Sequence, residues 1–229
     1  MSRVAASNAE AMKIVSLNIG LPREVSWHGQ GVTTGIYKAP TSARIRLRKL
    51  NLDGDRQADL TVHGGEHKAV YCYPVEHYAY WKKKLPDRDL PFGAFGENFT
   101  TEGLLEDDVH LGDRFAINDA EVIVTQPRLP CYKLGIRFQA DDMVKKFLAS
   151  RRTGFYVAVT REGEVAAGDE IVAAARNTSG VSIAEFLRLF LAKQFTPADA
   201  AAIHQLFELP SVPDDWKSYF HDRLQSADT

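Results

Sequence analysis

Apolar and polar residues alternate with a period of two through much of residues 13–176. At 43–50, arginines at every second position alternate with Ile45 and Leu47, which is typical of a strand with one buried face. Similar short segments lie between glycines and prolines at 14–19, 35–38, 69–73, 108–117, 121–125, 155–160 and 170–175. Because so many short strands must hide their edges, we expect a mainly β fold, a mostly antiparallel β-barrel.

The period changes to that of a helix in three later segments. Ser182, Thr196 and Ser211 each precede an acidic residue by three positions and begin a stretch with an apolar stripe. Helices are also expected after Pro74 and over 141–150. We therefore predict a disordered N-terminus at 1–12, a barrel domain at 13–176 and a three-helix C-terminal domain at 180–226. About 47 residues make too small a core alone, so the helices should pack on the barrel or in a homodimer.

Composition narrows the function classes. The 229 residues include 28 Lys and Arg against 30 Asp and Glu, so no global charge favours nucleic-acid binding. The 2 cysteines argue against a disulfide scaffold and for a reducing compartment. No apolar run approaches the roughly 18 residues of a membrane span, and the N-terminus lacks the apolar core of a secretory signal. We expect a cytoplasmic protein without membrane or nucleic-acid partners.

The segment from Gln126 to Leu134 holds the most informative candidate chemistry. Cys131 follows a proline, and Arg128 and Lys133 flank it. Thiolate is the nucleophile and the metal ligand, nearby cations favour it, and prolines stiffen the chain that presents it. We interpret Cys131 as a nucleophile or soft metal ligand, with the two cations holding an anion beside it. The alternative is a small buried hydrophobe.

A second cluster, at residues 53–69, is dense in ionisable groups. Gly64–Gly65 allows backbone N–H groups to approach a ligand and to form an anion nest, to which Lys68 adds a charge. His63 and His67 are four residues apart, but the intervening glycines disfavour the helix that a zinc pair would need. The alternative is a polar turn before a buried strand.

A third, weaker cluster is the glycine-rich segment 92–103. Its Glu97 and Asn98 either clamp a ligand or stabilise a tight turn. Cys72, between two tyrosines in a predicted strand, is expected in the core.

Taken in order, segments 53–70, 95–99 and 126–134 resemble the MOSC family, named for the C-terminal domain of molybdenum cofactor sulfurase. The C-terminal helices resemble the small three-helix domain of YiiM-like members. The resemblance implies a barrel of the pyruvate-kinase type. It also implies a pterin-dithiolene molybdenum cofactor whose metal takes a thiolate, here from Cys131.

The resemblance further implies reduction of N-hydroxylated compounds, such as 6-N-hydroxylaminopurine, to amines. Electrons would come from a separate reductase, because 2 cysteines cannot hold a four-cysteine iron–sulfur cluster. His63 or Lys68 would donate the proton that the leaving oxygen needs. The cofactor-binding residues would be Gly64, Gly65, Lys68, Glu97, Asn98, Arg128 and Lys133. Two alternatives remain: a non-catalytic carrier of cofactor or sulfur on Cys131, and a cysteine hydrolase using Cys131 with His63.

Overall fold

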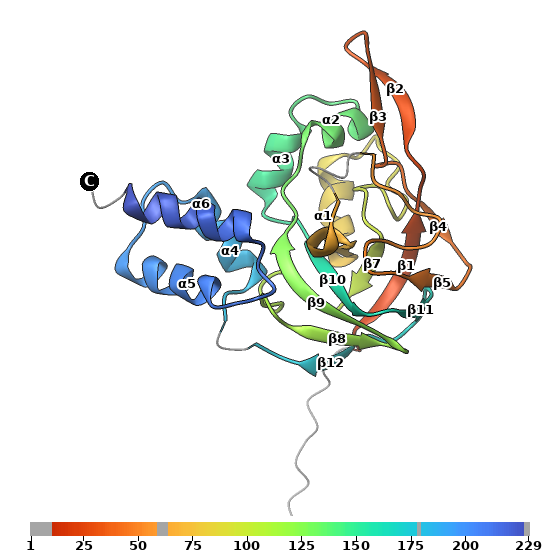
Figure 1. Cartoon of the computed structure of the whole chain (residues 1–229). Helices are drawn as coiled ribbons and strands as arrows, with labels where there is room; N and C mark the ends of the chain where they lie inside the picture. The colour runs from red at the N-terminus through yellow and green to blue at the C-terminus, as the bar shows by residue number, and fades with distance from the viewer. Residues whose placement is uncertain (1–10, 59–63, 178–179, 227–229) are drawn as a thin grey trace, which may run out of the picture.

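The computed structural model describes residues 11–58, 64–177 and 180–226. An eight-stranded sheet, in the order β12-β8-β9-β10-β6-β7-β1-β4, curls into a half-barrel (Figure 1). Its strands are β1 (Lys13–Ile19), β4 (Ala39–Thr41), β6 (Val70–Pro74), β7 (Phe99–Glu102), β8 (Arg114–Ile117), β9 (Ala120–Pro127), β10 (Phe155–Arg161) and β12 (Val172–Ala175). Two small sheets pair β2 (Arg23–Trp27) with β3 (Gln30–Thr34), and β5 (Ile45–Leu47) with β11 (Gly163–Val165).

The pairing is antiparallel except between β6 and β7, which are parallel and joined through helix α1 (Glu76–Lys84). Backbone bonds also bring the start of β1 to the chain before β12: the Ile14 amide donates to the Asp169 carbonyl at 3.0 Å. The predicted antiparallel sheet is therefore confirmed. The architecture is nevertheless mixed α/β, because helices cover the sheet: a short 3₁₀ helix η1 (Glu66–Lys68), α2 (Tyr132–Phe138), α3 (Met143–Ser150), α4 (Ile183–Leu191), α5 (Pro197–Phe207) and α6 (Asp214–Gln225).

Three local expectations differ from the structure. Residues 35–38 form no strand; they are a connection between β3 and β4. The β2–β3 hairpin was not predicted; its turn places His28 at φ 50° and Gly29 at φ 78°, the two positive φ angles that a tight hairpin needs. Helix α2 was not predicted either. It has 7 residues and no side-chain cap, so it lacks a helix-start signal.

Two apolar clusters hold these elements together. The larger lies inside the sheet and continues into the C-terminal helices through Phe186, Ile203 and Phe220, each fully buried. Burial of each such side chain is worth roughly 1.5–3 kcal/mol, so the helical stripes are stabilised by the sheet. The smaller cluster is aromatic and packs under α1 and α3, where the Trp81 indole donates to the Tyr73 hydroxyl at 2.6 Å. Among the described residues, no helix is both long and apolar enough to cross a membrane.

Candidate active site

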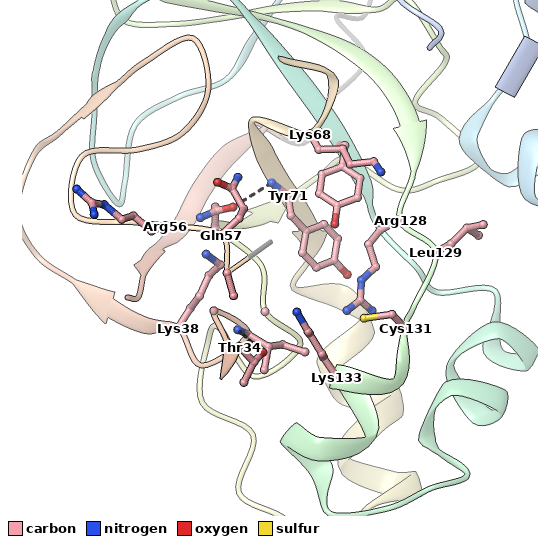
Figure 2. A pocket seen from close by; sticks show the side chains of 16 residues that line it. Thr34, Lys38, Arg56, Gln57, Lys68, Tyr71, Arg128, Leu129, Cys131 and Lys133 are labelled. Carbon is pink, nitrogen blue, oxygen red and sulfur yellow. Dashed lines mark hydrogen bonds between the residues drawn. The ribbon is translucent and has the colours of Figure 1, made fainter. Parts of the chain in front are cut away.

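A pocket opens where the chain after β9 meets η1 and the segments at 34–38 and 56–58 (Figure 2). We call it the cationic pocket. It is lined by Thr34, Gly35, Ile36, Lys38, Arg56, Gln57, Ala58, Lys68, Tyr71, Gly96, Asn98, Arg128, Leu129, Cys131, Lys133 and Tyr156. Five of these side chains carry positive charge, and no aspartate or glutamate is among the described lining residues. The pocket is thus suited to an anion.

Cys131 lies half-buried between β9 and α2, at the position just before the helix begins. Figure 2 shows its sulfur facing the guanidinium of Arg128. The Arg128 amide donates to the Gly154 carbonyl at 3.1 Å, and the Leu134 amide donates to the Cys131 carbonyl at 2.9 Å. Backbone bonds on both sides therefore fix the segment that presents the thiol. A guanidinium beside the sulfur favours the thiolate, the form that binds metals and acts as nucleophile.

Arg128 is a buried cation of the pocket that packs against two aromatic rings. Its residue is 5% exposed, and its guanidinium carbon lies 5.2 Å from the Tyr71 ring centroid and 5.1 Å from that of Phe147. Burial opposes its charge, but the ionisable groups of Tyr71, Tyr156 and Cys131 outweigh this, so the pKa of Arg128 is raised. The Nη1 atom has no hydrogen-bond partner among the described residues. A buried donor without an acceptor is costly, so this N–H group is available to an anionic ligand in the pocket.

Lys38 and Asp55 form a buried pair that sequence reasoning missed. The Lys38 Nζ lies 2.5 Å from Asp55 Oδ1, and the side chains are 8% and 1% exposed. Asp55 also accepts from the Asn98 amide group at 2.9 Å and from the Gly20 backbone N–H at 2.9 Å. Burial outweighs the attraction of Asp55 and lowers the pKa of Lys38. Asp55 lay in the polar cluster at 53–69, but Lys38 has no distinguishing local signal.

Lys68 comes from η1 and lies at the opposite end of the pocket from Lys38 and Lys133 (Figure 2). Burial lowers its pKa, and the charge of Asp215 partly counteracts this shift. The site thereby contains an ammonium group whose proton is released more readily than that of a solvated lysine.

The structure places the sequence-predicted residues in three ways. Cys131, Arg128, Lys133, Lys68 and Asn98 line the cationic pocket together. Gly64 and Gly65 line a neighbouring cavity between η1 and α6, which shares Lys68 with the cationic pocket. His63 lies outside the described residues. No group of three or more metal-ligating His, Cys, Asp or Glu side chains occurs in the described part of the chain, His67 included.

Glu97 differs from the expectation of a ligand clamp. Its side chain is fully buried and is absent from the pocket lining. The carboxylate accepts from the backbone N–H groups of Gly93 at 2.8 Å and Phe95 at 3.0 Å, from the Thr100 hydroxyl at 3.1 Å and from the Tyr78 hydroxyl. Burial raises the pKa of Glu97. The residue stabilises the turn that carries its neighbour Asn98, which does reach the pocket.

One connection runs from the cationic pocket to another part of the surface. Gly154 makes two hydrogen bonds: its carbonyl accepts from the Arg128 backbone N–H, and its own N–H donates to Glu106 Oε1 at 2.7 Å. The other carboxylate oxygen of Glu106 lies 2.7 Å from His77 Nε2. Glu106 and His77 line a separate cavity beside α1 that shares none of its described lining residues with the cationic pocket.

Comparison with known proteins identifies the family. The model of the MOSC domain matches residues 59–172. Protein YiiM of Escherichia coli is 32% identical over 206 residues, covering 89% of this chain and 90% of that protein. A protein of Gibberella moniliformis named "Reductase" is 29% identical over 204 residues, covering 87% of this chain but 35% of that protein. The crystal structure of YiiM from Geobacillus stearothermophilus superposes with a TM-score of 0.77 at 35% identity, covering 93% of this chain and 99% of that chain. On the match of motifs, fold and full-length relatives, the chain belongs to the MOSC domain family as a YiiM-like member.

Proposed function

We propose that this protein is an oxidoreductase that holds a pterin molybdenum cofactor in the cationic pocket and reduces N-hydroxylated compounds to amines. Electrons come from a separate reductase, because 2 cysteines cannot hold a four-cysteine cluster. The observation that carries the proposal is the thiol of Cys131 beside the buried, incompletely paired guanidinium of Arg128. The relative named "Reductase" supports the reaction class.

The lining residues fit such a cofactor. A soft thiolate suits a transition metal that already has sulfur ligands, so Cys131 would be the protein ligand. Arg128 and Lys133 would bind anionic oxygens of the cofactor, since guanidinium and ammonium groups form strong charge-assisted bonds with phosphate. The Asn98 amide, held by Asp55, supplies a neutral polar contact at the same wall.

Reduction of R–NHOH to R–NH₂ consumes two electrons and two protons and releases water. The cofactor, when bound, supplies the two-electron chemistry. The protein must supply at least one proton to the departing oxygen. Lys68 lines the pocket, and burial has lowered its pKa toward the range in which an ammonium is an effective general acid. His63, which lies outside the described residues, remains the other candidate donor.

The molybdenum-to-protein ratio tests the proposal. The protein is prepared from a host that makes the cofactor, and turnover of 6-N-hydroxylaminopurine is measured with an artificial electron donor. Cys131→Ser should lose most of the metal and turnover while remaining folded. Cys72→Ala is the matched control: this second thiol is buried in β6, outside the pocket, so metal and most activity should persist.

The other outcomes separate the alternatives. Cys131→Ser with full molybdenum and full turnover would contradict the assignment of the ligand. Wild-type protein that binds the cofactor but reduces no N-hydroxylated compound would instead be a cofactor carrier. Hydrolytic turnover without molybdenum that depends on Cys131 would identify a cysteine hydrolase.

A further inference from the structure

A second cavity adjoins the cationic pocket on the side of the C-terminal helices. We call it the α6 chamber; it is lined by Gly64, Gly65, Glu66, His67, Lys68, Gln126, Pro213, Asp215, Trp216 and Tyr219. Its volume is about 390 Å³. Pockets of a few hundred cubic ångströms are the size that accommodates small organic ligands.

The chamber and the cationic pocket are direct neighbours. Lys68 lines both cavities. Gln126, in the chamber wall, precedes Arg128, in the pocket wall, by two residues of nearly extended chain, which spans roughly 7 Å. A ligand in the chamber therefore lies next to the cationic pocket, with Lys68 in the wall of both.

The two cavities differ in chemistry. The cationic pocket has basic side chains and no lining carboxylate among its described residues, whereas the α6 chamber combines two exposed carboxylates, Glu66 and Asp215, with two half-buried aromatic rings. Those rings, Trp216 and Tyr219, are 5.6 Å apart and nearly perpendicular, at 88°. Aromatic faces accept the face or edge of a planar ring, and carboxylates accept hydrogen bonds from ring or exocyclic N–H groups.

The aromatic wall is fixed in place by the barrel. The Trp216 indole N–H donates to Gln126 Oε1 at 2.7 Å, and Gln126 in turn donates to the His67 carbonyl at 3.4 Å. The Thr125 hydroxyl holds the same carbonyl at 2.7 Å. A pre-formed wall costs little ordering when a ligand binds, which favours affinity.

We propose that the α6 chamber binds the ring of a planar heteroaromatic amine or hydroxylamine, with Trp216 and Tyr219 contacting the ring and Asp215 accepting its N–H groups. Helix α6 thus determines substrate specificity, while the barrel supplies the reactive pocket. The proposal adds a binding site for the substrate ring to the proposed reductase function, and it rests on that function for the identity of the reacting N-hydroxyl group. Ring binding in the chamber does not depend on it.

A binding experiment tests the chamber without any turnover. The probe is 2-aminopurine, a fluorescent planar heteroaromatic amine whose emission falls on stacking with an aromatic ring. Titration of the full-length protein should give saturable quenching. Asp215→Asn should weaken binding on the order of 10-fold, and Tyr219→Leu should do the same because ring stacking contributes energy of this order. Tyr219→Phe, which keeps the ring, should restore binding.

Asp214→Asn is the matched control. Asp214 is the preceding residue of α6, exposed and outside the chamber lining, so this variant removes the same charge without touching the ring site. Its dissociation constant should stay at the wild-type value. Equal weakening by Asp214→Asn and Asp215→Asn would reduce the effect to general electrostatics and overturn the proposal, as would an absence of saturable binding to the wild type.

Kinetics then connects the chamber with the reaction. With 6-N-hydroxylaminopurine, Tyr219→Leu should raise KM about 10-fold with little change in kcat, because it removes a ring of the chamber and leaves the charges around Lys68 in place. With N-methylhydroxylamine, which has no ring, both parameters should match the wild type. An equal rise in KM for the two substrates would refute the specificity role. If no N-hydroxylated compound is reduced at all, the proposed function fails while the 2-aminopurine result still decides the chamber.

Discussion

Replacement of Glu97 should unfold the protein more readily rather than empty its pocket. Four donors converge on this fully buried carboxylate: the N–H groups of Gly93 and Phe95 and the hydroxyls of Tyr78 and Thr100. In Glu97→Ala the hydroxyls can rotate toward other acceptors, but the two backbone donors cannot. Each buried donor without an acceptor costs about 1–3 kcal/mol, so the expected loss from the two backbone donors is about 2–6 kcal/mol.

That loss is a large part of the roughly 5–15 kcal/mol that stabilises a typical domain. For a chain of this size about 1 kcal/mol corresponds to about 2–4 °C in Tm, so Glu97→Ala should melt about 4–24 °C below wild type. Glu97→Gln keeps one acceptor oxygen but turns an NH₂ group toward a donor, so its loss should be intermediate. Thermal and urea unfolding measure both, and metal content is measured well below the transition.

Glu102→Gln is the control, because Glu102 pairs with Lys13 at 2.6 Å on the surface, where the two side chains are 40% and 46% exposed. Exposed pairs contribute at most about 1 kcal/mol, so its Tm should stay near the wild-type value. The reasoning is refuted if Glu97→Ala melts like Glu102→Gln. Loss of cofactor from a Glu97 variant of unchanged stability would restore the ligand-clamp interpretation.

Three further predictions follow from local geometry. Arg128→Met should lower molybdenum retention at least about 10-fold without lowering Tm, because it removes a charge-assisted ligand bond and a buried, incompletely paired cation; a fall in both would make Arg128 a structural residue. Gly154→Ala should cost several kcal/mol in urea unfolding, roughly 1–3 from the left-handed φ of 65° and more from a Cβ 2.3 Å from the Cys72 carbonyl, whereas Gly168→Ala, with φ 91° and open space, should show the strain alone. The Thr196 backbone N–H and then Arg188 lower the pKa of Asp199 to about 2, so its stabilisation is complete above its ordinary pKa of 3.8 and is lost as the pH falls toward 2. Asp199→Asn should remove that part of the acid transition seen by helical circular dichroism; an unchanged transition would disprove it.

The sequence was informative where the chemistry is contiguous. Arg128, Cys131 and Lys133 lie within six residues directly after strand β9, so all three reach the same pocket. The antiparallel sheet and most helices were also readable, because their apolar periods match their burial. Helix α2 was not, because a one-sided stripe cannot be recognised in 7 residues without a cap.

The sequence around a residue does not show which distant residues the order of the strands brings next to it. Lys38 and Tyr156 reach the pocket from a connection after β3 and from β10, more than 100 positions apart in sequence. The residues next to Lys38 and Tyr156 in the sequence give no sign that the two side chains line the same pocket. Glu97 illustrates the opposite difficulty: a glycine-rich turn with an acid has the same composition whether the carboxylate points to a ligand or to its own backbone, and only the fold decides.

Two backbone hydrogen bonds, from Gly154 to Glu106 and from Arg128 to Gly154, make the cationic pocket depend on Glu106, which is not among its described lining residues. A substitution at position 106 would remove the acceptor of the Gly154 N–H, and with it one support of the carbonyl that holds the Arg128 backbone, while every described pocket-lining residue stayed the same. A comparison that uses only the lining residues of two such pockets therefore leaves this support out.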